Sequence, residues 1–134
     1  MKKIALILIV LGIFAIAVSA NFAQGTLNNT TDFQKAIDDA QKQNKTIMLV
    51  FDQKGCYYCD LFKEDVLSNS EVISELNEDY ITVIIDVNQQ PQLASKYKVY
   101  GTPTIVFIDA NENQIDRIEG YVDADEFLDI LKGL

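Results

Sequence analysis

The sequence predicts a single α/β domain in which a mixed central sheet is covered by helices on both faces. Apolar runs of strand length alternate along the chain with stretches in which apolar residues recur at helical spacing. This alternation favours parallel strand pairing, whereas the last two predicted strands follow each other closely, as in an antiparallel hairpin. The 134 residues, 49% of them hydrophobic, are enough for one modest core.

Helical periodicity predicts five helices. The first one begins after Thr31, which together with Gln34 has the pattern of an N-terminal capping box. The second begins at Cys56, directly after Gly55 has ended a strand. The five helices are expected at residues 32–43, at 56–67, around 72–76, at 90–98 and at 123–131.

Four segments predict strands. The first two are apolar almost throughout, which is typical of central strands buried on both faces. The last one alternates and follows a tight turn at residues 110–113, so we expect it to be a hairpin partner. The four strands are expected at residues 46–52, 80–87, 104–109 and 114–119.

The composition argues against several classes of function. Lys and Arg total 11 against 20 Asp and Glu, which gives a formal net charge of −9. A chain this acidic lacks the basic surface that a phosphate backbone requires, so no nucleic-acid partner is expected. The sequence contains no histidine, which removes the Ser-His-Asp triad and the common zinc and haem ligand sets.

Residues 1–20 have the layout of a secretory signal peptide. Two lysines precede an apolar run at residues 4–18, and Val18-Ser19-Ala20 supplies small residues before a cleavage site at Asn21. The run is short for a membrane span, which needs about 20 apolar residues, and an uncleaved N-terminal anchor is the alternative. A polar linker at 21–30 and a domain at 31–134 would follow. The domain is expected outside the cytoplasm, periplasmic or secreted, or membrane-anchored if residues 1–20 remain.

The two cysteines form a Cys-x-x-Cys motif, Cys56-Tyr57-Tyr58-Cys59. A zinc site or an iron–sulfur cluster needs more ligands than two cysteines can supply, so no metal is expected. Attachment of a c-type haem needs histidine at position 60, which is Asp60. A structural disulfide stays an alternative, although it would close a very short loop and stabilise the fold little. Redox chemistry is the favoured interpretation.

The position of the motif supports this interpretation. Cys56 begins a helix, where free backbone N–H groups and the helix dipole lower the pKa of a thiol below the usual value of about 8.5. Cys59 lies one turn inside the helix and is expected to be more buried, as a resolving thiol should be. Lys54 adds a positive charge nearby, whereas three carboxylates oppose it: Asp52, Asp60 and Glu64.

These features resemble the thioredoxin family over residues 31–134. The resemblance rests on the motif between a strand and a helix, and on Gly101-Thr102-Pro103-Thr104 leading into a strand, a hairpin and a last helix. More narrowly, the chain is similar to exported thiol:disulfide oxidoreductases that have a Cys-x-Tyr-Cys site. The resemblance implies the thioredoxin fold, with a dithiol at a helix N-terminus.

The resemblance also implies roles for individual residues. Pro103 would form a cis peptide bond and pack against the dithiol. The backbone of Thr102 would pair with an extended substrate segment, and Gly120 would let that segment approach closely. Three tyrosines would form apolar walls of the substrate site: Tyr57, Tyr58 and Tyr121.

The sequence departs from the thioredoxin pattern in four places. Gly55 stands where thioredoxins carry tryptophan, and two tyrosines replace the Gly-Pro between the cysteines. Val50 and Ile84 occupy the positions of a buried aspartate and a lysine in thioredoxins. The carboxylate that helps to deprotonate the resolving thiol is therefore missing, and Asp52 and Glu64 are the candidates to replace it.

The sequence thus predicts an exported, monomeric thiol–disulfide oxidoreductase without a cofactor. Cys56 and Cys59 would be its catalytic residues, and reduction of protein disulfides is favoured over oxidation or isomerisation. Its partners would be protein disulfides or thiols and a membrane or secreted thiol donor. The alternative is a non-catalytic thioredoxin-fold binding module whose two cysteines form a static disulfide.

Overall fold

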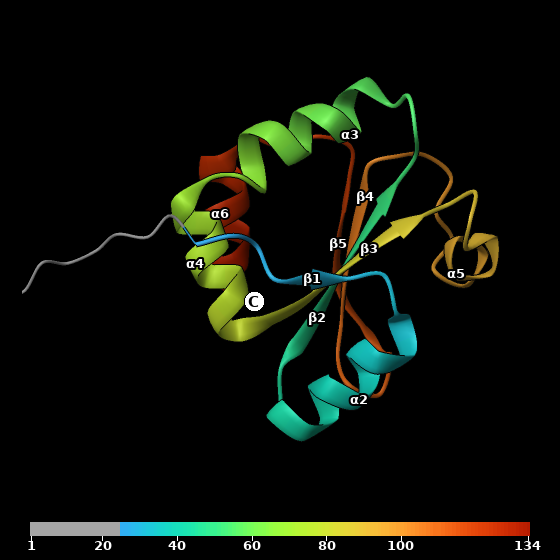
Figure 1. Cartoon of the computed structure of the whole chain (residues 1–134), viewed down its shortest axis with the longest axis vertical. Coiled ribbons are helices and arrows are strands. Elements are labelled where there is room, and N and C mark those ends of the chain that lie inside the picture. The colour runs from blue at the N-terminus through green and yellow to red at the C-terminus, as the bar shows by residue number, and fades with distance from the viewer. Residues whose placement is uncertain (1–24) are drawn as a thin grey trace, which may run out of the picture.

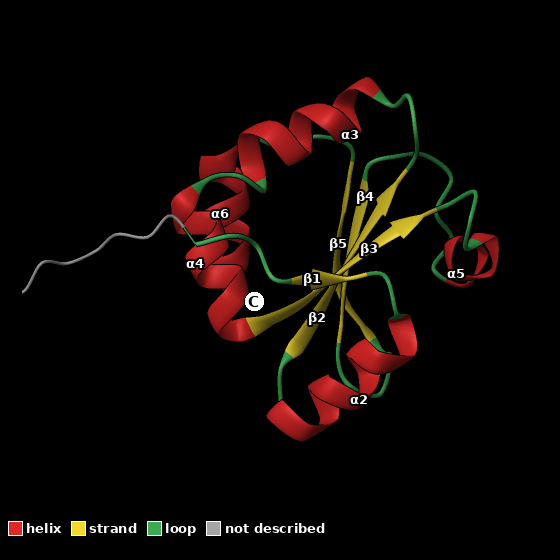
Figure 2. Cartoon of the chain, in the orientation of Figure 1, coloured by secondary structure: helices red, strands yellow, loops and turns green. Residues whose placement is uncertain are grey.

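A five-stranded mixed sheet lies between two layers of helices in the computed structural model, which describes residues 25–134 (Figure 1). The predicted signal peptide and residues 21–24 of the predicted linker lie outside the described residues. Helices and strands alternate along most of the chain, and a hairpin with a last helix closes it (Figure 2). The predicted α/β class and the helices on both faces of the sheet are confirmed.

The strands are arranged in the order β1-β3-β2-β4-β5. β3 pairs in parallel with β1 and β2, whereas β4 runs antiparallel to both β2 and β5. The predicted hairpin is therefore formed by β4 and β5. The strands span Asn29–Thr30 (β1), Thr46–Asp52 (β2), Tyr80–Asp86 (β3), Thr104–Ile108 (β4) and Gln114–Glu119 (β5).

The edge strand β1 is absent from the sequence prediction. Its two residues lie in the segment interpreted as a linker, and they pair with Thr82 and Val83 of β3. The backbone N–H of Asn28 also donates to the side chain of Asn77, at 2.9 Å. Two polar residues carry no periodic pattern, so only the neighbouring strand makes this segment extended.

The helices divide into two layers, one on each face of the sheet (Figure 1). One layer consists of α2 (Phe33–Gln43) and α5 (Pro91–Lys96). The other consists of α3 (Tyr57–Leu61) with the π-helical turn η1 (Phe62–Val66), α4 (Ser70–Asp79) and α6 (Ala124–Gly133). Among residues 25–134, no helix combines the length and the apolar character that crossing a membrane requires.

The central strand β2 supplies side chains to both cores. Met48 and Val50 pack with the layer of α4 and α6, whereas Ile47, Leu49 and Phe51 pack with the layer of α2 and α5. Successive side chains of a strand point to opposite faces, so a strand buried on both faces must be apolar throughout. This explains the continuous apolar run in the sequence.

The predicted capping box at Thr31 and Gln34 is wrong. Asp32 is the N-cap of α2, and its carboxylate accepts a hydrogen bond from the backbone N–H of Lys35 at 3.0 Å. Thr31 instead offers its carbonyl oxygen to the side-chain amide of Gln90, at 3.2 Å. Aspartate is at least as good an N-cap as threonine, so the helix begins one residue later than the box predicted.

Candidate functional site

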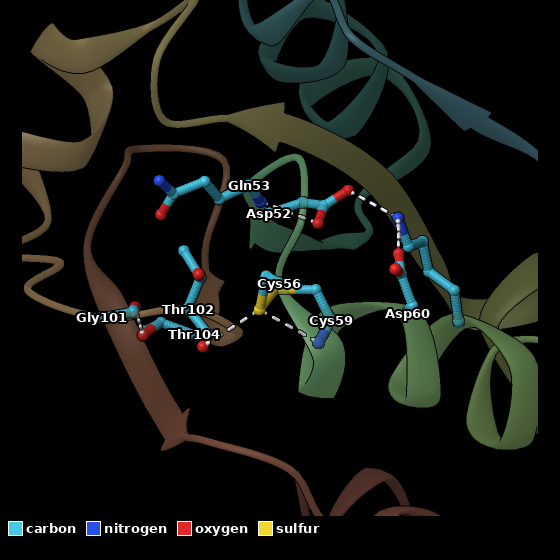
Figure 3. The surroundings of a disulfide bond; sticks show 9 residues. Asp52, Gln53, Cys56, Cys59, Asp60, Gly101, Thr102 and Thr104 are labelled. Carbon is cyan, nitrogen blue, oxygen red and sulfur yellow. Dashed lines mark hydrogen bonds and ion pairs between the residues drawn. A yellow bond between two sulfur atoms is a disulfide. The ribbon is translucent and has the colours of Figure 1, made fainter.

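Cys56 and Cys59 form a disulfide at the start of the helix that follows β2 (Figure 3). Cys56 is the N-cap of α3, and the two Cα atoms are 5.2 Å apart. The backbone N–H of Cys59 donates to the sulfur of Cys56 at 3.2 Å. A thiolate at this sulfur would keep that donor and would face the positive end of the helix dipole.

The two sulfurs differ in their access to solvent. Cys56 is partly exposed, whereas only 2% of Cys59 is exposed. The predicted difference in burial is confirmed. The sulfur of Cys56 is therefore the more accessible of the two, whereas Cys59 is buried and bonded to Cys56.

The loop before β4 places a second segment against the dithiol. The Thr102–Pro103 peptide bond is cis, as the resemblance implied, and Pro103 is buried. The sulfur of Cys56 lies 3.5 Å from the carbonyl oxygen of Thr102, although 46 residues separate them in the sequence (Figure 3). The backbone N–H of Gly120 donates to the carbonyl oxygen of Pro103 at 2.9 Å. The fold thus brings together four of the predicted site residues.

Gly55, which replaces the tryptophan of thioredoxins, has a positive φ of 79°. It lies in a turn closed by a hydrogen bond from the backbone N–H of Cys56 to the carbonyl oxygen of Gln53, at 3.2 Å. Glycine adopts this backbone conformation readily, whereas a residue with a Cβ is strained there. The glycine therefore fits the conformation of the loop that leads to Cys56.

The three predicted wall tyrosines lie close to one another. Tyr57 is 71% exposed and Tyr58 is 57% exposed, and their ring centroids are 5.3 Å apart. The ring of Tyr121 lies 6.4 Å from that of Tyr58, and its hydroxyl donates to Asp65 at 3.3 Å. Partial burial and the nearby Asp65 carboxylate raise the pKa of Tyr121. The phenol therefore stays neutral and keeps its donor near pH 7.

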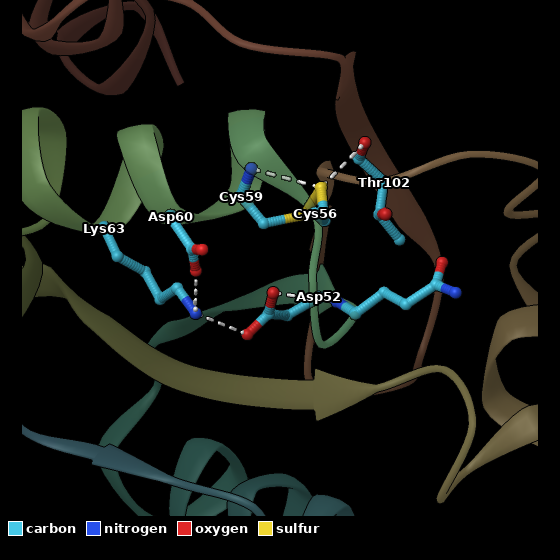
Figure 4. Close-up of polar contacts among 7 residues, drawn as sticks. Asp52, Cys56, Cys59, Asp60, Lys63 and Thr102 are labelled. Atoms are coloured by element: carbon cyan, nitrogen blue, oxygen red, sulfur yellow. Dashed lines mark hydrogen bonds and ion pairs between the residues drawn. A yellow bond between two sulfur atoms is a disulfide. The ribbon is translucent and has the colours of Figure 1, made fainter.

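The sequence prediction did not include Lys63, which carries a positive charge next to the motif. Its ammonium lies 2.9 Å from the carboxylate of Asp52 and 3.2 Å from that of Asp60 (Figure 4). The hydrogen bond to Asp52 is the main cause that raises the pKa of Lys63. Asp60 and Lys63 are three residues apart on a helix, and this spacing is the sequence signal that could have revealed their ion pair. No such local signal exists for the ion pair between Lys63 and Asp52.

The strand positions at which thioredoxins carry an aspartate and a lysine are apolar here. Val50 and Ile84 pair in register on β2 and β3, and both belong to the apolar cluster that also contains Phe62. Of the two candidate carboxylates, Asp52 is held in place by Lys63 and by the backbone N–H of Gln53, at 2.8 Å. Glu64 lies on the exposed surface. Asp52 is therefore the less exposed of the two, with 17% of its side chain exposed.

Within the part of the chain that the structure describes, no group of three or more histidine, cysteine, aspartate or glutamate side chains is arranged to hold a metal ion. The arrangement suits thiol–disulfide exchange, because Cys56 and Cys59 form a disulfide in which Cys56 is the accessible partner.

Comparisons with known proteins agree with this geometry. Residues 33–134 match the family described as "Thioredoxin-like domain". The thiol:disulfide interchange protein DsbD of Photorhabdus laumondii is 33% identical over 124 residues, which cover 87% of this chain and 20% of that protein. The chain thus spans about a fifth of the length of this curated relative.

Two solved structures have the same fold. A structure described as DsbH oxidoreductase superimposes with a TM-score of 0.73 and 22% identity, and the match covers 81% of this chain and 84% of that one. The oxidised C-terminal domain of Neisseria meningitidis DsbD superimposes with a TM-score of 0.66 and 22% identity, and the match covers 79% of this chain and 98% of that one.

Proposed function

Because the chain belongs to the thioredoxin-like domain family, we propose that it is an exported thiol–disulfide oxidoreductase that reduces disulfides of secreted or periplasmic proteins. The observation that carries this proposal is the Cys56–Cys59 pair at the start of a helix, with one sulfur accessible and the other buried. The fold and the membership of the family are as the sequence implied.

In the first step, the Cys56 thiolate attacks one sulfur of a substrate disulfide. A bond forms between Cys56 and that sulfur, the substrate disulfide breaks, and the other substrate sulfur leaves as a thiolate. The Cys59 N–H and the helix dipole stabilise the attacking thiolate. The backbone of Thr102 and the walls formed by Tyr57 and Tyr58 would hold the substrate segment.

In the second step, Cys59 resolves the mixed disulfide. Cys59 loses its proton, and its thiolate attacks the sulfur of Cys56, which releases the second substrate sulfur as a thiolate. Asp52 would accept that proton, directly or through water, because it is the less exposed of the two candidate carboxylates and ends the strand that leads to the motif. The substrate gains two electrons, and the protein is left with the Cys56–Cys59 disulfide. A second thiol protein, secreted or membrane-bound, must then reduce this disulfide.

The electrostatics of the site support reduction over oxidation. A strongly oxidising dithiol needs a highly stabilised thiolate in its reduced form. Here one lysine is shared between two carboxylates, so it adds little net positive charge beside the sulfurs. A thiolate that is only modestly stabilised favours the disulfide form, and the reduced protein is then an electron donor.

The export proposal rests on residues 1–20, which have the layout of a signal peptide. N-terminal sequencing of the protein from the extracytoplasmic fraction should begin at Asn21. An intact Met1 in the membrane fraction would instead support the uncleaved anchor, and an intact Met1 in the soluble extracytoplasmic fraction would contradict the cleavage.

Trapping with single cysteine variants tests the reaction. Cys59→Ser should accumulate mixed disulfides with protein substrates through Cys56, because the resolving thiol is gone. Cys56→Ser should trap few or none, because Cys59 is buried. Equal trapping by both variants would contradict the assigned roles. A wild-type disulfide that resists mild reductant in the folded protein would favour the static binding module.

A further inference from the structure

A surface pocket of about 230 Å³ lies beside the dithiol, on the side of the loop before β4. Its walls come from that loop and from the end of β5, and Thr104 and Glu119 are paired across the two strands. Gly101, Thr102 and Thr104 are seen next to Cys56 in Figure 3. The pocket is lined by Tyr100, Gly101, Thr102, Thr104, Glu119 and Gly120.

Two side chains of this pocket are prominently exposed. Tyr100 is 92% exposed, and the side chain of Glu119 is 70% exposed. An aromatic ring and a carboxylate in one pocket form a suitable environment for a long cationic side chain. The apolar stem can lie against the ring, and the charge can meet both the ring face and the carboxylate.

Glu119 already contacts one cation, Arg117, at 3.0 Å. The same guanidinium also donates to the carbonyl oxygens of Tyr97 at 2.9 Å and of Lys98 at 3.3 Å, so it is shared among three acceptors. The Glu119 side chain is 70% exposed, and an ion pair open to solvent contributes at most about 1 kcal/mol, so its carboxylate can still accept a second cation. The net charge of −9 favours a basic partner over an acidic one.

The pocket lies where a substrate residue next to the substrate's reacting cysteine would be placed. The carbonyl of Thr102 is 3.5 Å from the sulfur of Cys56, and Thr102 also lines the pocket. A substrate segment paired with the backbone of Thr102 would carry its cysteine to Cys56. Residues follow one another by about 3.3 Å along a strand, so a side chain one or two residues from that cysteine reaches the pocket.

We propose that this pocket is a specificity site that binds a lysine or arginine side chain one or two residues from the reacting cysteine of the substrate. This inference rests on the proposed function, whose disulfide exchange at Cys56 it uses unchanged. Tyr100 and Glu119 determine the preference without contacting the reacting sulfurs. The substrate class is thus a protein disulfide with a basic residue beside one of its cysteines.

Short disulfide-linked peptides that differ in one residue beside the cysteine test this proposal. The residue is arginine, glutamine or glutamate, and the measurement is the second-order rate of reduction by the reduced protein. We expect the arginine peptide to react about fivefold faster than the glutamine peptide at low salt, and the glutamate peptide to be the slowest. High salt should reduce the difference.

Variants of the pocket residues test whether the preference for the arginine peptide arises in this pocket. Glu119→Gln should bring the arginine rate close to the glutamine rate and leave the glutamine rate unchanged, and Tyr100→Ala should weaken the preference. Glu78→Gln, which makes the same charge change on the exposed surface of α4, should preserve it. Equal rates for the three peptides, or a preference that survives in Glu119→Gln, would overturn the specificity site. If the wild type reduces none of the peptides, the proposed function itself fails, which is a different result.

Discussion

The ammonium of Lys63 lies 2.9 Å from the carboxylate of Asp52, the last residue of β2 (Figure 4). The same ammonium also reaches Asp60, which directly follows Cys59. One cation therefore compensates two carboxylates beside the dithiol. Because the contact with Asp52 raises the pKa of Lys63, the lysine stays charged over the whole pH range in which a thiol titrates.

Replacing Lys63 by methionine should make the Cys56 thiol harder to ionise. The change leaves two uncompensated negative charges near the sulfurs, which disfavours the thiolate. We expect reduction of a neutral peptide disulfide at pH 7 to slow by about two- to fivefold, and to recover as the pH is raised. The measurement is the rate as a function of pH, together with thiolate absorbance.

Two further variants control this experiment. Lys132→Met removes a lysine from the last turn of α6 and should leave the pH profile unchanged. Adding Asp60→Asn to Lys63→Met removes one of the uncompensated charges, so the pH profile should move back toward that of the wild type. A profile that does not differ between wild type and Lys63→Met would refute the electrostatic role.

Tyr97→Phe should preserve or increase stability at pH 7. Tyr97 is 6% exposed and packs against Phe33 and Phe51, but its hydroxyl has no hydrogen-bond partner among the described residues. Removing an unsatisfied buried hydroxyl relieves a desolvation cost, so we expect a change of about 0 to +1 kcal/mol in the free energy of unfolding. Urea denaturation measures this, and a loss of more than about 1 kcal/mol would mean that the hydroxyl is satisfied.

At alkaline pH, the difference in stability between the wild type and Tyr97→Phe should increase. Burial, followed by the charge of Glu112, raises the pKa of Tyr97 to about 12. An unfolded tyrosine ionises near pH 10, before the folded one does, so the wild type loses stability as the pH rises from about 10 to about 12. Tyr97→Phe lacks this contribution. Its advantage over the wild type should therefore grow between pH 9 and pH 11 in the same urea experiment.

Asp32→Ala should destabilise the protein by about 1 kcal/mol, because it removes the side chain that caps α2. Thr31→Ala is the matched control. The threonine interacts with Gln90 through its backbone carbonyl, which the substitution keeps, so its effect should stay within about 0.5 kcal/mol. Thermal or urea unfolding measures the loss of stability in each of the two variants. A larger loss in Thr31→Ala than in Asp32→Ala would restore the capping box that the sequence suggested.

Gly120→Ala should cost about 1–2 kcal/mol of stability. Gly120 has a φ of 92°, which strains any residue with a Cβ, although no atom would obstruct the added methyl group. Gly101→Ala lies in the neighbouring loop, also has open space around it and lacks the positive φ. It should be neutral or slightly stabilising. Equal losses in the two variants would show that the methyl group, and not the backbone conformation, matters.

The sequence by itself determined the features that depend on neighbouring residues. The apolar run of β2, the Cys-x-x-Cys motif at the start of a helix and the hairpin of β4 and β5 are each encoded within a few residues, because strand and helix periodicity are local. The greater burial of Cys59 also followed from its place one turn into the helix.

Only the tertiary structure decided which distant residues meet at the site. Parallel pairing of β3 makes Asn29 and Thr30 a strand, and the antiparallel pairing of β4 with β2 brings Thr102 to Cys56. The contact of Lys63 with Asp52 joins a helix to the end of a strand. Such contacts depend on how layers pack and which strands pair, and a local pattern contains neither, so the site took its final shape only when the sheet was assembled.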